Sequence, residues 1–272
     1  MSPTQPLPPV HPAQPLPPAH PGSAMNPTVV RNLQIICAWC GPAFVVLYGL
    51  AWVVLGHNAP PPTLAGTGAQ LVAGYYLKYR GQILLGQCLA TCFGMLYLPW
   101  TCQLAVMMWQ REKAPLLSLL QLTGGLLTAW VLVFSPALWV WCAEMAPSMD
   151  PELIKAVHTL AWYVYDMTYM ITTIQVIAIC LFVFLDHAQP RIMPRWAGVL
   201  ALFSGLSFLP LTFLPYFKTG LLAVNGYWSF HVAFVTYGLF TAIIGYCMAR
   251  SLRQQPPAQV ALAGPGQRRV NG

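Results

Sequence analysis

One acidic side chain stands alone inside a long apolar stretch of this sequence. Asp166 lies within an apolar and aromatic run over residues 160–185, and it is the only carboxylate well inside such a run. Placing an ionisable group in hydrocarbon costs roughly 2.5–3.5 kcal/mol on insertion scales, which favours a functional role. A carboxyl group there could exchange a proton with a histidine, or hold the single polar group of an otherwise apolar ligand. Asp166 is therefore the first candidate site residue.

A histidine on the last apolar run is the predicted partner of this carboxyl group. His231 precedes Arg250 by 19 residues, and Asp166 precedes Asp186 by 20 residues. At 1.5 Å per helical residue, both lie about 28 to 30 Å from the same membrane boundary. We therefore predict that Asp166 and His231 share a level near the outer interface, where they could form an acid–base pair.

Aromatic side chains surround Asp166 in the sequence. Tyr165 and Tyr169 are four residues apart and share a helical face. These rings could hold a flat apolar ligand around one polar anchor, or they could form an aromatic belt at the membrane surface. For His158 and His57, contact with headgroups and water is the simpler interpretation. The candidate ligand-binding residues are Asp166, His231, Trp162, Tyr165, Tyr169 and His158.

The remaining motifs give little support for a metal or a cofactor. No HxxxH or HExxH spacing is present, and the inner half offers only His187 where a dihaem bundle needs facing histidine pairs. Residues 39–43, WCGPA, imitate a thioredoxin motif but carry Ala43 in place of its second cysteine. The eight cysteines all lie in apolar stretches, where we expect them to pack as small hydrophobic groups. We expect no metal site and no cofactor.

The elements that position these residues are membrane-spanning helices. Of the 272 residues, 57% are hydrophobic and 7% are charged, whereas a soluble domain has roughly 25% charged residues. This composition excludes a soluble globule. The net charge of +7 comes from basic residues that stand between apolar runs and orient helices in the bilayer. We therefore expect membrane lipids, and no nucleic acid, as partners.

Six apolar runs are long enough to cross about 30 Å of hydrocarbon. They cover residues 33–55, 83–109, 116–142, 160–185, 196–217 and 228–249. The first, third and fifth runs begin at similar intervals, which indicates three hairpins. The sequence thus predicts an all-α polytopic membrane protein with six transmembrane helices arranged as three hairpins. Short helices are expected over 69–80 and 150–160, the second beginning with Asp150 as N-cap and Pro151 at the first helical position.

Basic residues predict the orientation of these spans. Nine lie on the side of both chain ends: Arg31, Arg111, Lys113, Arg191, Arg195, Arg250, Arg253, Arg268 and Arg269. Four lie on the other side: Lys78, Arg80, Lys155 and Lys218. Both termini are therefore predicted to be cytoplasmic, in a cell inner membrane. An aromatic belt is expected from Trp52, Trp139, Trp141, Trp162 and Trp228 outside and from Trp109 and Trp196 inside.

The chain divides into three segments. Residues 1–28 contain the repeat QPLPPVHPA and QPLPPAHPG and predict a disordered Pro-rich tail. We expect a six-helix transmembrane domain over 29–253 and a flexible tail over 254–272. The first residues lack the basic and apolar regions of a signal peptide, and Met25 offers a second start site.

Four short segments carry a resemblance to known proteins. They are CAWCGPAF at 37–44, DPELI at 150–154, PRWAG at 194–198, and FKTG with NG at 217–220 and 225–226. They resemble a family of uncharacterised bacterial six-span integral membrane proteins over residues 31–250. The resemblance implies the six-span topology and transfers no catalytic residue.

Three functions are compatible with these observations. The first is a protein that binds or moves a small apolar molecule, lipid or sterol-like, in a cavity near Asp166. The second is a membrane enzyme that uses Asp166 and His231 for acid–base chemistry. The third is an accessory subunit of a membrane complex. The oligomeric state is unknown from sequence.

Overall fold

The chain is an all-α, multi-pass membrane protein. The computed structural model describes residues 26–255, and within them every regular element is a helix. Six helices in this range are long and apolar enough to cross a membrane: Pro27–Leu55, Arg80–Trp109, Leu116–Met145, Pro151–Leu185, Arg195–Phe213 and Tyr227–Gln254. The six predicted spans are confirmed. The predicted Pro-rich tail lies outside the described residues up to residue 25, and so does the C-terminal tail from residue 256.

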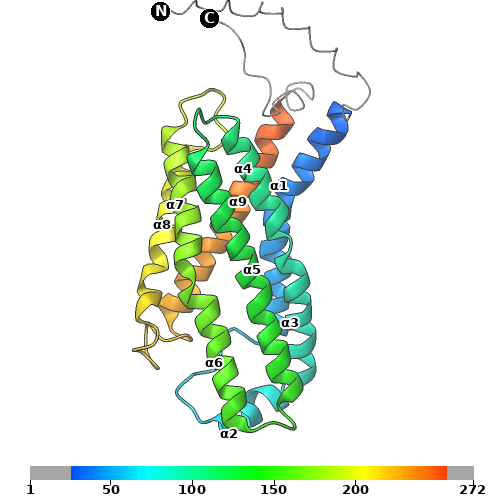
Figure 1. Ribbon diagram of the computed structural model, residues 1–272, viewed down its shortest axis with the longest axis vertical. Coiled ribbons are helices and arrows are strands. Elements are labelled where there is room, and N and C mark those ends of the chain that lie inside the picture. Colours follow the sequence, from blue (N-terminus) through cyan, green and yellow to red (C-terminus); the bar gives the residue numbers. More distant parts are fainter. Residues whose placement is uncertain (1–25, 256–272) are drawn as a thin grey trace, which may run out of the picture.

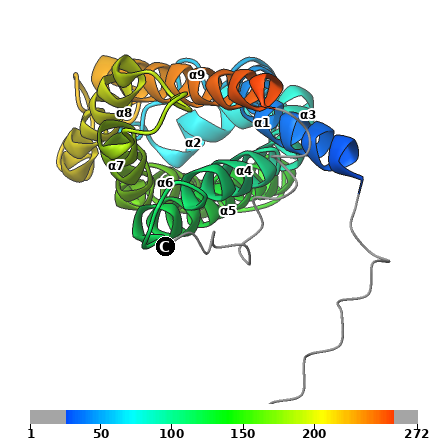
Figure 2. The same cartoon turned by 90° about the horizontal axis from the view of Figure 1, so that it is seen from above.

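Most spans are built from two consecutive helical segments. The segments are α1 (Pro27–Gly49) with η1 (Leu50–Leu55), α3 (Arg80–Gly94) with α4 (Tyr97–Trp109), α5 (Leu116–Met145), α6 (Pro151–Met167) with α7 (Tyr169–Leu185), α8 (Arg195–Ser207) with η3 (Leu209–Phe213), and η4 (Tyr227–Val232) with α9 (Ala233–Gln254). Each span packs on the next one in the chain, and α1 packs on α9. The three hairpins therefore form a closed ring of helices (Figures 1 and 2).

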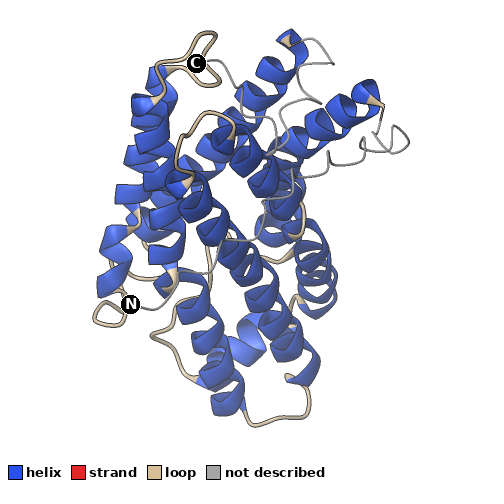
Figure 3. Ribbon diagram, turned by 45° about the horizontal axis from the view of Figure 1, so that its top comes forward, coloured by secondary structure: helices blue, strands red, loops and turns tan. Residues whose placement is uncertain are grey.

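The helical ends of the described chain meet at one end of this ring. Arg31 at the start of α1 donates a hydrogen bond from Nη2 to the carbonyl oxygen of Arg253 at the end of α9, over 3.3 Å. We call this the terminal end of the ring, and the opposite end the far end. Both are visible in Figure 1, with the terminal end uppermost. The elements between them are helical throughout, as Figure 3 shows.

Two short helices cover part of the far end. They are α2 (Gly68–Leu71) and η2 (Val72–Leu77), which together pack against α3, α5 and α6. Thr67 begins α2 with a reciprocal capping box, in which Thr67 Oγ1 accepts from the Gln70 amide and Gln70 Oε1 accepts from the Thr67 amide. Glu152 Oε1 accepts from the Gly68 amide over 2.6 Å and so ties α2 to the start of α6.

The fourth span differs from the sequence prediction in where its helix is interrupted. Asp150 is the N-cap of α6 and accepts from the amides of Glu152 and Leu153, as predicted. The predicted short helix does not end near residue 160, however, but continues to Met167. The interruption lies at Thr168, whose hydroxyl donates to the Val164 carbonyl over 2.8 Å. The break therefore falls two residues after Asp166.

This span is longer than a bilayer requires. Its 35 residues correspond to about 50 Å at 1.5 Å per residue, against about 30 Å of hydrocarbon. In Figure 1, α3, α5 and α6 reach beyond the level at which the fifth and sixth spans end. The first half of α6 therefore belongs to a part of the protein that projects at the far end.

Three of the tryptophans predicted to lie in an outer aromatic belt are inside the ring instead. Trp52, Trp139 and Trp162 are buried, with ring centroids between 4.8 and 6.1 Å apart. The prediction was wrong for these residues because their level along the span does not determine which face of the helix carries them. At the terminal end, Trp109 and Trp196 are exposed, as a belt requires.

Candidate functional site

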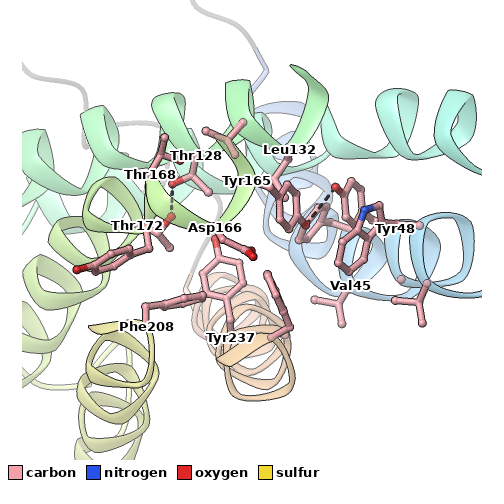
Figure 4. A pocket seen from close by; sticks show the side chains of 18 of the residues that line it. Val45, Tyr48, Thr128, Leu132, Tyr165, Asp166, Thr168, Thr172, Phe208 and Tyr237 are labelled. Atoms are coloured by element: carbon pink, nitrogen blue, oxygen red, sulfur yellow. Dashed lines mark hydrogen bonds between the residues drawn. The ribbon is translucent and has the colours of Figure 1, made fainter. Parts of the chain in front are cut away.

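A cavity of about 140 Å³ lies inside the ring, between five of the six spans (Figure 4). Its wall is mostly aromatic and aliphatic, with a few hydroxyl groups and one carboxyl group. The polar residues that line it are Tyr48, Thr128, Tyr165, Asp166, Thr168, Tyr169, Thr172 and Tyr237. A largely apolar cavity with a few convergent polar groups is the usual form of a small-molecule site.

Among the described residues that line this cavity, Asp166 is the only one with a carboxyl group. It lies in the last turn of α6, is 2% exposed, and points toward the open space in Figure 4. Its Oδ1 atom has no hydrogen-bond partner within residues 26–255. No lysine, arginine or histidine among the described residues lines the cavity. A buried polar atom normally has a partner, so this oxygen marks a place for a group that the protein itself does not provide.

Most hydroxyl groups of the cavity wall are already paired with one another. The hydroxyls of Tyr48 and Tyr165 lie 3.2 Å apart, and those of Thr128 and Thr172 lie 2.9 Å apart. Tyr237 donates to the hydroxyl of Tyr97, which lies outside the cavity lining. These pairs satisfy the hydroxyl groups, and the buried polar atoms of the wall without a partner among the described residues are Asp166 Oδ1 and the indole nitrogen of Trp52.

Aromatic rings form the remaining wall. Trp52 stacks on Tyr165, with centroids 5.0 Å apart and an interplanar angle of 23°. Phe234 packs against Trp52 from the sixth span, and Phe208 packs edge-on to Phe234 and to Tyr237. These contacts bring ring faces and edges from η1, α6, α9 and the residue between α8 and η3 around one space, which suits a flat apolar molecule.

The structure brings together three of the six residues predicted from sequence. Asp166, Tyr165 and Tyr169 all line the cavity. The Tyr169 hydroxyl is hydrogen bonded to Thr212, so it faces away from Asp166 toward η3. His231, Trp162 and His158 do not line the cavity.

The predicted acid–base pair of Asp166 and His231 is not formed. His231 is exposed and stacks on Tyr227, with ring centroids 5.3 Å apart. Its neighbour Phe230 is buried and packs on Trp52. Because adjacent residues of a helix face different directions, a helix that turns Phe230 inward places His231 outside. The depth estimate gave no information about the helix face, which is why the pairing failed.

His158 and Trp162 belong to a second buried cluster, between α6 and η2. The indole of Trp162 donates to His158 Nε2 over 3.2 Å, and Tyr76 Oη lies 2.6 Å from His158 Nδ1. An indole nitrogen can only donate, so Nε2 accepts and the ring proton lies on Nδ1, which donates to Tyr76. Burial raises the pKa of the Tyr76 hydroxyl, which therefore stays neutral. His158 is fully buried with both nitrogens satisfied, contrary to the interpretation that it meets headgroups and water.

Another buried network runs from the cavity wall toward the terminal end. Tyr97 donates to Gln175 Oε1 over 2.9 Å. The side-chain amides of Gln175 and Gln121 both donate to Thr101 Oγ1, over 3.2 and 2.7 Å. The network joins the second, third and fourth spans at a place where hydrocarbon would otherwise leave these groups unsatisfied.

Sequence reasoning missed several residues of the cavity wall. Tyr48, Thr128, Thr172 and Tyr237 line the cavity from four different helices. Their signal in the sequence is a hydroxyl group within an apolar run. That signal identifies a polar group in a span but not the face on which it lies, so it could not assign them to one site.

The geometry gives no support for a metal centre in the described part of the chain. No group of three or more His, Cys, Asp or Glu side chains there is arranged to hold a metal ion.

Comparisons with protein family models, with curated proteins and with solved structures gave no match to this chain. The cavity and its carboxyl group are therefore the features of this chain that bear on its function.

Proposed function

We propose that this integral membrane protein binds a small, largely apolar molecule in the ring cavity, with Asp166 as the anchor for its one polar group. A single observation carries the proposal. A carboxyl group that is 2% exposed has an oxygen without a hydrogen-bond partner and faces a cavity lined by aromatic rings. Such an atom is costly in an empty apolar space, and a ligand that supplies the missing partner removes this cost.

The chemistry of the wall limits the polar group of the ligand. The carbonyl oxygen of the Asp166 carboxyl group accepts hydrogen bonds, and no lysine, arginine or histidine among the described residues of the cavity lining donates one. The ligand should therefore carry a donor, which means a hydroxyl or an amine. An amine would gain further from the surrounding ring faces.

The volume limits the apolar part of the ligand. The cavity of about 140 Å³ is close to the engineered cavity of about 150 Å³ that binds benzene. A molecule with one ring, or a short portion of a longer lipid, matches this space. A whole sterol is too large for it, so we narrow the expected ligand class accordingly.

The seam between α1 and α9 supports entry of this ligand from the bilayer. Gly49 and Gly238 line the cavity from these two helices, and both are half-buried. A Cβ atom added to Gly49 would have no neighbour within 4 Å, and one added to Gly238 would meet only Val45 Cγ1, at 3.5 Å. The two glycines leave room where the ring closes.

We also propose that the terminal end is cytoplasmic in a cell inner membrane. Seven of the nine basic residues that the sequence assigns to the cytoplasmic side lie in the described chain. They stand at the start of α1, at the end of α9 and in the two links of the terminal end, which is the distribution expected of cytoplasmic loops. Reporter fusions to residue 113 and to residue 148 would test this orientation, with the first expected inside and the second outside.

The ligand proposal can be tested with three probes of similar shape. Toluene, benzyl alcohol and benzylamine share one ring and differ in the group attached to it. Binding to the detergent-purified chain would be measured by calorimetry for the wild type, Asp166→Leu and the matched control Glu144→Leu. Glu144 is an exposed carboxylate on α5 outside the cavity lining.

The expected result is a preference for the donors that depends on Asp166. The wild type and Glu144→Leu should bind the alcohol or the amine about tenfold more tightly than toluene, which corresponds to about 1.4 kcal/mol, the upper part of the range for one net hydrogen bond. Asp166→Leu should lose this preference and retain toluene binding. Equal affinity of the wild type for all three probes would contradict the proposal, and so would an unchanged preference in Asp166→Leu.

A further inference from the structure

A groove of about 430 Å³ lies at the terminal end, between the start of α8 and the end of α9. It is outside the ring cavity and shares no residue with it. Among the residues that line it are Arg191, Pro194, Trp196, Ile243, Tyr246 and Arg250. The proposed function does not use this groove.

The groove carries two positive charges without a counter-charge. Arg191 and Arg250 line it, and no carboxylate of the described residues does. Within residues 26–255 the one ion pair joins Lys155 to Glu152, on the first turns of α6 at the far end. The Nε atom of Arg191 is buried and has no hydrogen-bond partner among the described residues. Two guanidinium groups beside one hollow are therefore free to bind an anion.

The first turn of α8 adds further donors beside these guanidinium groups. This helix of 13 residues begins at Arg195, and its N-cap residue Pro194 has no side chain that could accept from the first amides. The amide of Ala197 bonds to the Pro194 carbonyl, which leaves the amides of Arg195 and Trp196 available. The positive end of the helix dipole thus adds to the charge of Arg191 and Arg250, which favours a phosphate group.

Apolar and aromatic side chains continue the groove along the membrane-facing surface. Trp196 is 56% exposed and Tyr246 is 53% exposed, at the level where tryptophan and tyrosine meet lipid headgroups. Ile243 lies about one turn before Tyr246 on α9, toward the hydrocarbon. Cations at the end of the groove and apolar groups along it match a molecule with an anionic head and an apolar tail.

We propose that this groove binds the phosphate of an anionic phospholipid, held by Arg191, Arg250 and the first turn of α8. The acyl chains lie along Trp196, Tyr246 and Ile243. A free phosphate ion would use the cations but not these apolar groups, so the structure favours the lipid.

The test measures lipid binding by native mass spectrometry of the full chain in detergent. The probes are phosphatidylglycerol and phosphatidylcholine with the same acyl chains, and inorganic phosphate serves as a competitor. The variant Arg191→Gln/Arg250→Gln removes two charges from the groove. The control Lys113→Gln/Arg253→Gln removes two charges from the same end, at residues that do not line the groove. Thermal melting in detergent confirms that both variants are folded.

The groove variant should lose selectivity, whereas the control should keep it. We expect the wild type to bind phosphatidylglycerol about tenfold more tightly than phosphatidylcholine, and the groove variant to bind both equally, as expected when charge-assisted hydrogen bonds are removed. The control should differ from the wild type by less than about twofold, since exposed charges are screened.

Three outcomes would overturn the proposal. Equal losses in the groove variant and the control would mean that diffuse surface charge, not a site, holds the lipid. Equal binding of both lipids by the wild type would mean that the groove does not select an anionic headgroup. Displacement of phosphatidylglycerol by inorganic phosphate at the same concentration would show that the groove recognises a phosphate ion and not a lipid.

Discussion

Two buried ionisable residues lie eight positions apart on α6, and their surroundings are opposite. Both ring nitrogens of His158 are hydrogen bonded, to Tyr76 and Trp162. Asp166 faces a cavity with one oxygen unpartnered in the described chain. A polar group whose partners all come from the protein serves the fold, whereas a polar group that lacks one is available to a ligand. The same helix therefore carries a structural residue and a candidate binding residue.

The network of Tyr97, Gln175, Thr101 and Gln121 extends this comparison to the membrane interior. Its members come from three spans and bond mainly to one another. Like the His158 cluster, it joins helices that apolar packing alone would not align, because every donor must find its own acceptor. One atom of this network, Gln121 Oε1, has no partner among the described residues. Substitutions should therefore act mainly on stability in the His158 cluster and in this network, and on binding at Asp166.

The largest effect on stability is expected from Gly125→Ala. A Cβ atom at this position would lie 1.9 Å from Thr101 Oγ1 and 2.8 Å from Gln175 Nε2, in the centre of the buried network. Overpacking together with broken hydrogen bonds should lower the free energy of unfolding by about 4 kcal/mol. Unfolding in mixed micelles with increasing SDS measures this change.

Gly205→Ala is the matched control for this substitution. Its added Cβ would meet Val176 Cγ1 at 3.6 Å, which is an ordinary contact. The control should change the free energy of unfolding by less than about 1 kcal/mol. A similar loss in both variants would show that any methyl group added within a span lowers the free energy of unfolding, and that the network makes no particular contribution to stability.

His158→Ala should have the second largest effect. The substitution empties a fully buried site and leaves the Trp162 and Tyr76 groups without their partner. The combined cavity and desolvation penalties predict a loss of about 3 kcal/mol in the same unfolding measurement. Affinity for benzyl alcohol should stay unchanged in the folded variant, because His158 does not line the cavity. A loss of affinity without a loss of stability would place His158 in the binding site.

The sequence predicted the spans well because a bilayer imposes a simple requirement. Any chain that crosses it needs a long apolar helix, and the six runs met that condition. The start of α6 was also predictable, because Asp150 and Pro151 act locally. The interruption at Thr168 was not predictable, because the hydroxyl of a threonine within an apolar run can also donate to the carbonyl four residues earlier while the helix continues without a break.

The candidate site was predictable only in part, for a related reason. An acid within a span identified Asp166, and the four-residue spacing identified Tyr165 and Tyr169, although the break at Thr168 places these two residues in α6 and α7. The choice of His231 required knowledge of how α6 and η4 are rotated about their axes, which depends on packing between distant segments. Tryptophans such as Trp139 were misplaced for the same reason. The sequence gives the level of a residue along a span but not the face of the helix on which it lies.

Asp166→Leu should leave stability unchanged or raise it by up to about 1 kcal/mol in the absence of ligand. The substitution replaces an unpartnered carboxyl group by an apolar side chain of similar shape, which removes a desolvation penalty. Unfolding in SDS micelles, compared with Glu144→Leu, measures the difference. A loss above about 1 kcal/mol would mean that Asp166 has a stabilising partner in the membrane, and the contrast with His158 would then fail.

The smallest effect is expected from His231→Ala. The residue is exposed and its contacts are ring contacts with Tyr227 and Phe230, so the free energy of unfolding should change by less than about 0.5 kcal/mol. Binding of benzyl alcohol should also be unchanged, because Phe234, Tyr237 and Gly238, and not His231, line the cavity from the sixth span. This measurement tests the rejected pairing of Asp166 and His231 directly. If His231→Ala weakened binding as strongly as Asp166→Leu, the two side chains would have to meet when a ligand is bound, in an arrangement of the sixth span that differs from the one described. An unchanged affinity leaves Asp166 as the sole ionisable anchor and confines α9 to supplying aromatic walls.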